Sequence, residues 1–411
     1  MEILIIDGAG KVCFFTLSVK QLNIKKGRNF TMAYEYVNPI KQFNFQINRV
    51  LTYGDAACSR QEVTESLSSV RTFAQWNQAW LTLAEKAERE KRWLHAAYYY
   101  RMAEFFMKAD NPQKMQTYLK CIEYFYKGFD SELYLSYRKD KIPFEEGMLN
   151  SIVIPASDSK GTVLVCGGYD SFMEEFVLQV GPWAERGYTV ILFEGPGQGI
   201  CLHQNMYFRH DFEKPVSAVI DFYGLNRCAM IGISWGGYFA LRSAAFEKRI
   251  AAAVAYDVMD NGFEVMTNIF PAPVSSLIRL AYRKQWAGII NAVTGLLCKK
   301  SILADWGLSQ GTYITGTKTA YEFYQKLAEH NLDGITGHYT QDILLLAGEK
   351  DHYIPLGQFW RLKEKVHSDK SVTSRLFTEA EGGEQHCQIG NHMLAMNTIL
   401  DWLDDVFADK K

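Results

Sequence analysis

From about residue 150 onward, short apolar runs that end in glycine or an acidic residue alternate with stretches of helical spacing. Continuous apolar runs of this length are typical of strands that are buried on both faces of a parallel sheet. Their alternation with helices predicts an α/β fold with a mostly parallel, doubly wound sheet. In such a sheet the ligand site lies beyond the carboxyl ends of the strands. The five runs are residues 161–168, 188–199, 227–237, 249–257 and 342–351.

Residues 60–128 follow a different pattern. Apolar side chains such as Trp76, Trp80, Leu83 and Ala84 recur at intervals of three and four, and charged residues fill the other positions. This spacing lines up one face of a helix. An aromatic stripe at helical spacing is more typical of a core than of a ligand site. We therefore predict a small helical domain that packs through its aromatic stripe.

These patterns divide the chain into parts. Residues 32–145 are predicted to form a helical domain, and residues 146–411 a larger α/β domain. The segment at about 258–335, rich in aromatic residues, is predicted to be a helical lid inserted into the α/β domain. Two interpretations of the leader, residues 1–31, stay open. Either it lies upstream of a natural start at Met32, because the codons before Met32 can spell a ribosome-binding sequence, or it is a short hairpin.

Composition limits the classes of function. Lys and Arg total 44 against 46 Asp and Glu, for a net charge of −2, which gives no electrostatic footprint for a nucleic-acid partner. The eight cysteines show no metal-ligand spacing, so we expect reduced thiols, no metal ion and no cofactor. The N-terminal residues do not resemble a signal peptide, and no apolar run has the length of a spanning helix. We expect a cytoplasmic protein with a small-molecule substrate and no nucleic-acid or membrane partner, and leave a homodimer open.

The stretch "CAMIGISWGGYF" carries the first candidate chemistry. Gly232, Ser234 and Gly236 form a Gly-x-Ser-x-Gly pattern that follows an apolar run and precedes a helix-like segment. This strand–turn–helix context is typical of a nucleophile elbow, in which the tight turn leaves no room for side chains at the two glycines. The alternative is an ordinary serine in a glycine-rich loop. The context favours a nucleophile.

A serine nucleophile needs a base and a third group that orients the base. Hydrolases with this elbow present the acid after a later strand and then a late histidine. Asp351 directly follows an apolar run, and His386 lies in a loop before the last helical segment. We favour Asp351 over Glu349, because Glu349 comes before the loop has turned. Two other histidines, His352 and His392, are interpreted as structural.

An oxyanion hole takes one backbone N–H from the residue after the nucleophile and one from the loop after an early strand. The first donor is Trp235. In the loop "CGGYDS" the glycines let the backbone approach a substrate, so Tyr169 is the second candidate donor and Asp170 a candidate substrate-binding residue. The alternative is that these glycines only make a tight turn. "FEGPGQG", residues 193–199, lacks the Lys-Ser/Thr of a phosphate-binding loop and is interpreted as a structural turn at the rim of the site.

Several stretches resemble a known family. "GGYDSFMEEF", "FEGPGQG", "GISWGGYFALRSAA" and "GGEQHCQIGN", with the helical region ahead of them, are similar to the α/β-hydrolases related to 2,6-dihydroxypseudooxynicotine hydrolase and to the fungal polyketide-shortening hydrolases of pigment pathways. The resemblance runs from about residue 40 to the end. It implies an α/β-hydrolase fold in which residues 32–145 form a helical cap over the active site and residues 146–411 the catalytic domain. It also implies hydrolysis of carbon–carbon bonds next to ketones. It also places the catalytic Ser, Asp and His on Ser234, Asp351 and His386.

Members related to the nicotine enzyme also use an extra acidic residue in the segment after the elbow helix. Here "AYDVMDNGFEV" offers Asp257, Asp260 and Glu264. The choice among the three stays open, and Asp257 and Glu264 are taken as candidate substrate-binding residues.

The chemistry implied is attack of a serine on a carbonyl, followed by hydrolysis of an acyl-enzyme. A triad does not decide the scissile bond, which is C–C if the leaving group is a stabilised carbanion and an ester or amide if it is an alkoxide or amine. We therefore predict a serine hydrolase that acts on an aromatic or polyketide-like small molecule, by cleavage of a C–C bond next to a ketone or of an ester. The alternatives are an esterase or peptidase, an acyl-transferring or cyclising enzyme on the same triad, and a non-catalytic regulator.

Overall fold

The computed structural model describes residues 34–337 and 339–408, together with the backbone of residues 2–6 and 12–16. Strand β1 (Glu2–Ile6) pairs antiparallel with β2 (Val12–Thr16). The chain divides into two compact units, Met1–Thr31 and Met32–Lys411. The predicted start at Met32 lies outside the described residues, so the upstream-start hypothesis stays a prediction.

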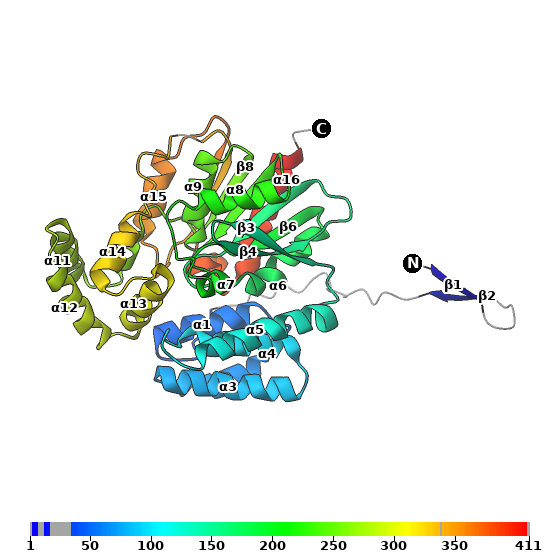
Figure 1. Ribbon diagram of the computed structural model, residues 1–411, viewed down its shortest axis with the longest axis horizontal. Helices are drawn as coiled ribbons and strands as arrows, with labels where there is room; N and C mark the ends of the chain where they lie inside the picture. Colours follow the sequence, from blue (N-terminus) through cyan, green and yellow to red (C-terminus); the bar gives the residue numbers. More distant parts are fainter. Residues whose placement is uncertain (1, 7–11, 17–33, 338, 409–411) are drawn as a thin grey trace. The chain divides into compact units, whose positions relative to one another are not determined.

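An eight-stranded sheet runs through the larger unit (Figure 1). Its strands lie in the order β10-β9-β8-β7-β5-β6-β4-β3. All strand pairs from β10 to β6 are parallel, and β4 and β3 join the sheet antiparallel. The predicted α/β fold with a mostly parallel sheet is confirmed. The strands are β3 (Arg138–Phe144), β4 (Gly147–Ile154), β5 (Gly161–Cys166), β6 (Tyr188–Phe193), β7 (Cys228–Ile233), β8 (Ile250–Tyr256), β9 (Asp342–Gly348) and β10 (Val372–Phe377).

The five predicted apolar runs became strands β5 to β9, and the sequence analysis missed β3, β4 and β10. Strands β3 and β10 are the two edges of the sheet, and most of their side chains are exposed or half-buried. An edge strand needs no continuous apolar run, because only part of its surface is covered. Helices α9 (Gly236–Phe246) and α16 (His392–Ala408) both pack against the central strand β8.

In the described part of the chain, five α-helices precede the sheet and are called here the N-terminal helices. The predicted helical pattern over residues 60–128 is confirmed, and α1 adds a helix before it. The aromatic stripe forms a core, as the ring centroids of Trp76 and Trp80 are 5.6 Å apart and Phe43 of α1 lies 4.9 Å from Trp76. The N-terminal helices are α1 (Lys41–Thr52), α2 (Arg60–Leu67), α3 (Phe73–Arg89), α4 (Trp93–Phe105) and α5 (Lys114–Gly128).

A second group of helices, called here the inserted helices, lies between β8 and β9 in the chain. It falls within the segment at about 258–335 that was predicted to be a lid. The inserted helices are α10 (Gly262–Asn268), α11 (Ala272–Arg283), α12 (Ala287–Cys298), α13 (Ile302–Thr315) and α14 (Ala320–Ala328). The remaining helices are α6 (Val177–Val180), α7 (Gly199–His203), α8 (Glu213–Phe222) and α15 (Leu356–Lys365). Within the described part of the chain, no helix combines the length and the apolar character needed to span a bilayer.

Candidate active site

Ser234 lies at the turn between β7 and α9, where the sequence predicts an elbow. Its φ of +63° is in the left-handed region, which a non-glycine residue adopts only where its surroundings enforce it. A Cβ added to Gly232 would lie 1.7 Å from the carbonyl oxygen of Gly236, and one added to Gly236 would lie 2.9 Å from that of Gly167. Both positions therefore require glycine on steric grounds, and the turn holds the serine at the carboxyl end of the sheet.

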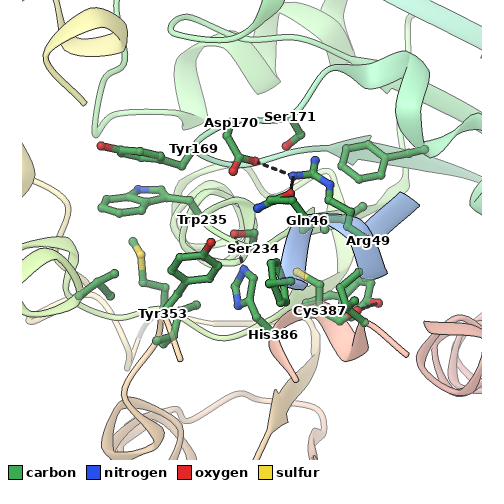
Figure 2. Close-up of a pocket in the computed structure, with 18 of the residues that line it drawn as sticks. Gln46, Arg49, Tyr169, Asp170, Ser171, Ser234, Trp235, Tyr353, His386 and Cys387 are labelled. Atoms are coloured by element: carbon green, nitrogen blue, oxygen red, sulfur yellow. Dashed lines mark hydrogen bonds and ion pairs between the residues drawn. The ribbon is translucent and has the colours of Figure 1, made fainter. Parts of the chain in front are cut away.

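The structure brings the predicted serine, histidine and aspartate together in one chain of hydrogen bonds. The Oγ atom of Ser234 lies 2.8 Å from Nε2 of His386, and Nδ1 of His386 lies 2.6 Å from Oδ2 of Asp351 (Figure 2 shows the first pair). Asp351 follows β9, and its Oδ1 accepts the N–H groups of Tyr353 and Ile354. The turn thus fixes the carboxylate, which in turn faces the imidazole.

A second carboxylate also faces His386. Asp257 follows β8, and its Oδ2 lies 3.3 Å from Nδ1 of His386. The same carboxylate accepts the N–H of Cys387 and the side-chain amide of Gln388, and Asp257 is only 1% exposed. It is absent from the wall of the pocket described below. This position gives no support to the substrate-binding role predicted for Asp257.

The other acidic and histidine candidates lie elsewhere. Glu264 of α10 and Asp260 both form ion pairs with Arg361 of α15, and Glu264 does not line the pocket. Glu349 accepts the N–H of Glu379. Of the two histidines interpreted as structural, His392 is buried and packs against Tyr53. His352 is exposed and packs its ring against Tyr353.

The pKa values of the two carboxylates beside His386 are shifted in opposite directions. Burial raises the pKa of Asp351, but the charge and hydrogen bond of His386 outweigh it, and the pKa lies below its ordinary value. For Asp257, burial dominates and the pKa is raised. Burial lowers the pKa of His386, but the charge of Asp351 and hydrogen bonds to both carboxylates raise it well above 6.5. Asp351 is therefore the carboxylate that stays ionised beside the imidazole.

The raised pKa of His386 predicts a pH dependence. A general base must be neutral to take a proton, so kcat/KM is expected to fall as the pH drops through the pKa of His386, with a midpoint above 6.5. The free energy of unfolding changes in the opposite direction. The ion pair of protonated His386 with Asp351 stabilises the folded state below pH 6.5, and this contribution is lost as the pH rises through the raised pKa of His386. A pH–rate profile of kcat/KM checks the first statement, and an acid limb centred at or below 6.5 would contradict it.

Two backbone N–H groups border the site without a protein acceptor. Among the described residues, neither the N–H of Tyr169 nor that of Trp235 donates a hydrogen bond to the protein. A Cβ added to Gly168 would lie 2.6 Å from the nitrogen of Trp235, so the loop after β5 and the start of α9 are in close contact. Both amides are therefore without a protein acceptor beside Ser234, and their role as oxyanion-hole donors stays a prediction.

The loop that carries Tyr169 is fixed from several sides. The side-chain amide of Gln198 donates to the carbonyl oxygens of Gly167 and Gly168, at 2.8 and 3.0 Å. Arg101 of α4 donates to the carbonyl oxygen of Asp170, and Ser171 accepts the N–H of Gly168. The motif "FEGPGQG" was predicted to be a structural turn, and through Gln198 this turn supports the loop beside the site. The sequence analysis did not single out Gln198 or Arg101.

A pocket opens over Ser234 and is lined by residues from three parts of the chain. In Figure 2 the rings of Tyr169 and Trp235 lie on one side of Ser234, and Gln46 and Arg49 lie on the other. Helix α1 contributes Phe45, Gln46 and Arg49, and Tyr53 follows directly after its end. The segment between β8 and β9 contributes Met259, Val265, Met266 and Trp306. The pocket therefore has a largely aromatic and apolar wall and a polar end at α1.

One group of potential metal ligands occurs among the described residues. Ligand atoms of Asp257, His386 and Cys387 lie within 4.8 Å of one another. A metal ion there would need a ring nitrogen of His386, and both ring nitrogens already form hydrogen bonds, to Ser234 and to Asp351, so a metal centre would break one of these bonds.

Comparisons with known proteins agree with this architecture. The model of the family described as "Alpha/beta hydrolase family" matches residues 162–388, more than half of the chain. Hydrolase acrC of Aspergillus aculeatus is 26% identical over 430 residues, covering 91% of this chain and 98% of that protein. The 20-hydroxy-prefusarin hydrolase FUS2 of Gibberella moniliformis is 26% identical over 415 residues, covering 90% and 97%. The crystal structure of 2,6-dihydroxy-pseudo-oxynicotine hydrolase has 19% identity and a TM-score of 0.67, covering 89% of this chain and 96% of that one.

Proposed function

This chain belongs to the alpha/beta hydrolase family and is a hydrolase, and we propose that it is a serine hydrolase that works through an acyl-enzyme. In this proposal Ser234 is the nucleophile, His386 the general base and Asp351 the residue that orients it. The observation that carries the proposal is the continuous hydrogen-bonded chain from Ser234 through His386 to Asp351 at a sterically enforced elbow.

In the proposed mechanism each of these three residues has a defined role. Nε2 of His386 takes the proton as Oγ of Ser234 attacks a carbonyl carbon, and ionised Asp351 stabilises the imidazolium that forms. The N–H groups of Tyr169 and Trp235 bind the tetrahedral oxyanion. His386 then returns the proton to the leaving group, and a water molecule hydrolyses the acyl-enzyme. No metal ion or cofactor takes part in this sequence of steps.

We propose that the substrate is an aromatic or polyketide-like small molecule. The bond cleaved is a C–C bond next to a ketone, or an ester bond. The aromatic wall of the pocket supports a substrate of this kind. The name of one relative, 20-hydroxy-prefusarin hydrolase, also points to a small organic substrate. We further propose that the N-terminal helices act as the cap and the inserted helices as the lid, because residues of both groups line the pocket.

The proposal is tested by turnover of a panel of 1,3-diketones and esters in H₂¹⁸O, with product mass as the measurement. Hydrolysis through an acyl-enzyme is expected to place one ¹⁸O atom in the carboxylic acid product, and the product masses are expected to sum to substrate plus water. Products without an added water would instead identify an acyl-transferring or cyclising enzyme. A parallel incubation with Ser234→Ala corrects for spontaneous hydrolysis.

A further inference from the structure

Arg49 is a buried cation in the same pocket as the candidate nucleophile. It lies on α1, is only 8% exposed, and lines the pocket together with Ser234 and His386. Figure 2 shows its guanidinium at the polar end, next to Gln46 and Asp170. A buried guanidinium at the edge of a reaction site is available to any negative charge that develops there. None of the steps proposed above uses it.

The two terminal nitrogens of Arg49 are bound unequally. Nη2 lies 2.8 Å from Oε2 of Glu175, a short, charge-assisted hydrogen bond. Nη1 makes long hydrogen bonds, at 3.3 Å to Oδ1 of Asp170 and 3.4 Å to Oε1 of Gln46, and the hydroxyl of Tyr53 also interacts with the guanidinium. Hydrogen bonds from guanidinium to carboxylate are ordinarily shorter than this. Nη1 is therefore the nitrogen that can take up a further acceptor in the pocket.

The surrounding carboxylates hold Arg49 in place through Nη2 and bind Nη1 only weakly. Glu175 is shared, because its Oε1 also accepts a hydrogen bond from Nε of Arg101 at 2.7 Å. Burial raises the pKa of Glu175, but the two arginines outweigh it, so the carboxylate stays ionised. One fully buried carboxylate thus binds two arginines. The second carboxylate near Arg49, that of Asp170, is 21% exposed and makes only the long contact.

Cleavage of a C–C bond places a specific demand on the leaving group. When the tetrahedral intermediate collapses, the electron pair of the C–C bond passes to the leaving carbon. In a 1,3-dicarbonyl compound this charge is delocalised onto the oxygen of the second carbonyl, giving an enolate. A cation beside that oxygen stabilises the departing group in the transition state. The oxyanion donors Tyr169 and Trp235 serve the other oxygen, that of the attacked carbonyl.

Resting on the proposed function, we propose that Nη1 of Arg49 binds the second carbonyl oxygen of a 1,3-dicarbonyl substrate and stabilises the enolate that leaves. The proton that His386 took from Ser234 goes to the carbon of the enolate, which departs as a ketone. Water then converts the acyl-enzyme to the carboxylic acid. The net reaction adds one water molecule across the C–C bond. The acyl half of the substrate lies against the aromatic wall, away from α1.

The test compares two substrates that share one acyl group, a 1,3-diketone and an aryl ester. Both form the same acyl-enzyme and differ only in the leaving group, and the aryl ester places no enolate oxygen at Arg49. Arg49→Met is expected to lower the ratio of the acylation rate of the diketone to that of the ester by about 10²-fold. Arg49→Lys keeps the charge without the planar fork, so a smaller decrease, by about 10-fold, is expected. If Arg49→Met does not fold, as judged by thermal unfolding, Arg49→Lys decides the result.

Arg101→Met is the matched control. Arg101 is as deeply buried, binds the same Glu175, and does not line the pocket over Ser234. Its loss is expected to lower the rates for both substrates in the same proportion, because it holds the loop of Tyr169. An unchanged ratio in Arg49→Met, or an equal change of the ratio in Arg101→Met, would overturn the role of Arg49 while wild-type hydrolysis still supported the proposed function. No turnover of either substrate and no reaction with a fluorophosphonate would instead remove the proposed function itself.

Discussion

Ser234→Ala is expected to lower kcat by about 10³-fold or more, because removal of the nucleophile leaves only the catalysis that binding and the oxyanion donors supply. The physical reason is the position of the hydroxyl, 2.8 Å from Nε2 of His386, because alanine leaves this base no hydroxyl to activate. The variant is expected to fold, since alanine keeps the left-handed backbone with less bulk at this turn. The measurement is kcat on whichever diketone or ester the wild type turns over fastest.

Ser243→Ala is the matched control for that variant. Ser243 lies on α9, is fully buried, and its hydroxyl has no hydrogen-bond partner in the described structure. Its removal is expected to change kcat less than about 3-fold, because surface and core changes away from the site act through stability alone. Turnover of Ser234→Ala at a rate close to that of the control would exclude Ser234 as the nucleophile.

Asp351→Asn is expected to lower kcat by about 10³- to 10⁴-fold, as the loss of the orienting carboxylate does in a triad. Asparagine presents an amide to Nδ1 of His386 and stabilises the wrong tautomer. Asp351 is the carboxylate at 2.6 Å, and its lowered pKa keeps it ionised throughout the working range. The loss is therefore expected in kcat, with KM little changed, because the residue does not line the pocket over Ser234.

Asp257→Asn is the informative comparison, because both carboxylates face the same nitrogen. Asp257 lies farther from it, at 3.3 Å, and burial raises its pKa. We expect a loss of about 10-fold, since its main hydrogen bonds go to Cys387 and Gln388 and position the loop of the histidine. A larger loss in Asp257→Asn than in Asp351→Asn would reverse the assignment and make Asp257 the orienting acid.

The elbow can be predicted from the sequence because its pattern lies within five consecutive residues. Gly232 is required by a contact with Gly236 inside the turn itself, whereas Gly236 is required by the carbonyl oxygen of Gly167 in the loop after β5. Asp351 and His386 are 35 positions apart, and His386 is 152 positions from Ser234. They are predictable only because the order of strands in a parallel sheet brings the ends of β7 and β9 to the same edge.

The polar end of the pocket could not be predicted in the same way. Arg49 meets Glu175 across 126 positions, and nothing local to either residue indicates the contact. Helix α1 buries both its apolar and its polar side chains, from Phe43 to Thr52, so its pattern shows no clear exposed face. The sequence did contain one indication of a polar site, since Gln46 and Arg49 lie among aromatic and branched residues in a short helix. The pattern alone does not say what such polar residues face.

The acidic residues after β8 show a second limit. Asp257, Asp260 and Glu264 lie within eight positions of one another, and the sequence cannot rank them. In the structure Asp257 turns toward His386, whereas Asp260 and Glu264 are held by Arg361 of α15. The ion pairs that hold Asp260 and Glu264 come from Arg361, which lies about 100 positions later in the chain than Asp260. These contacts therefore depend on the tertiary fold.

The central claim is that Ser234 is an activated nucleophile, and intact mass after incubation with a fluorophosphonate tests it most directly. The account predicts one covalent adduct on the wild type and none on Ser234→Ala, with Ser243→Ala labelled like the wild type. The absence of an adduct on the wild type, or an adduct that persists in Ser234→Ala, would contradict it.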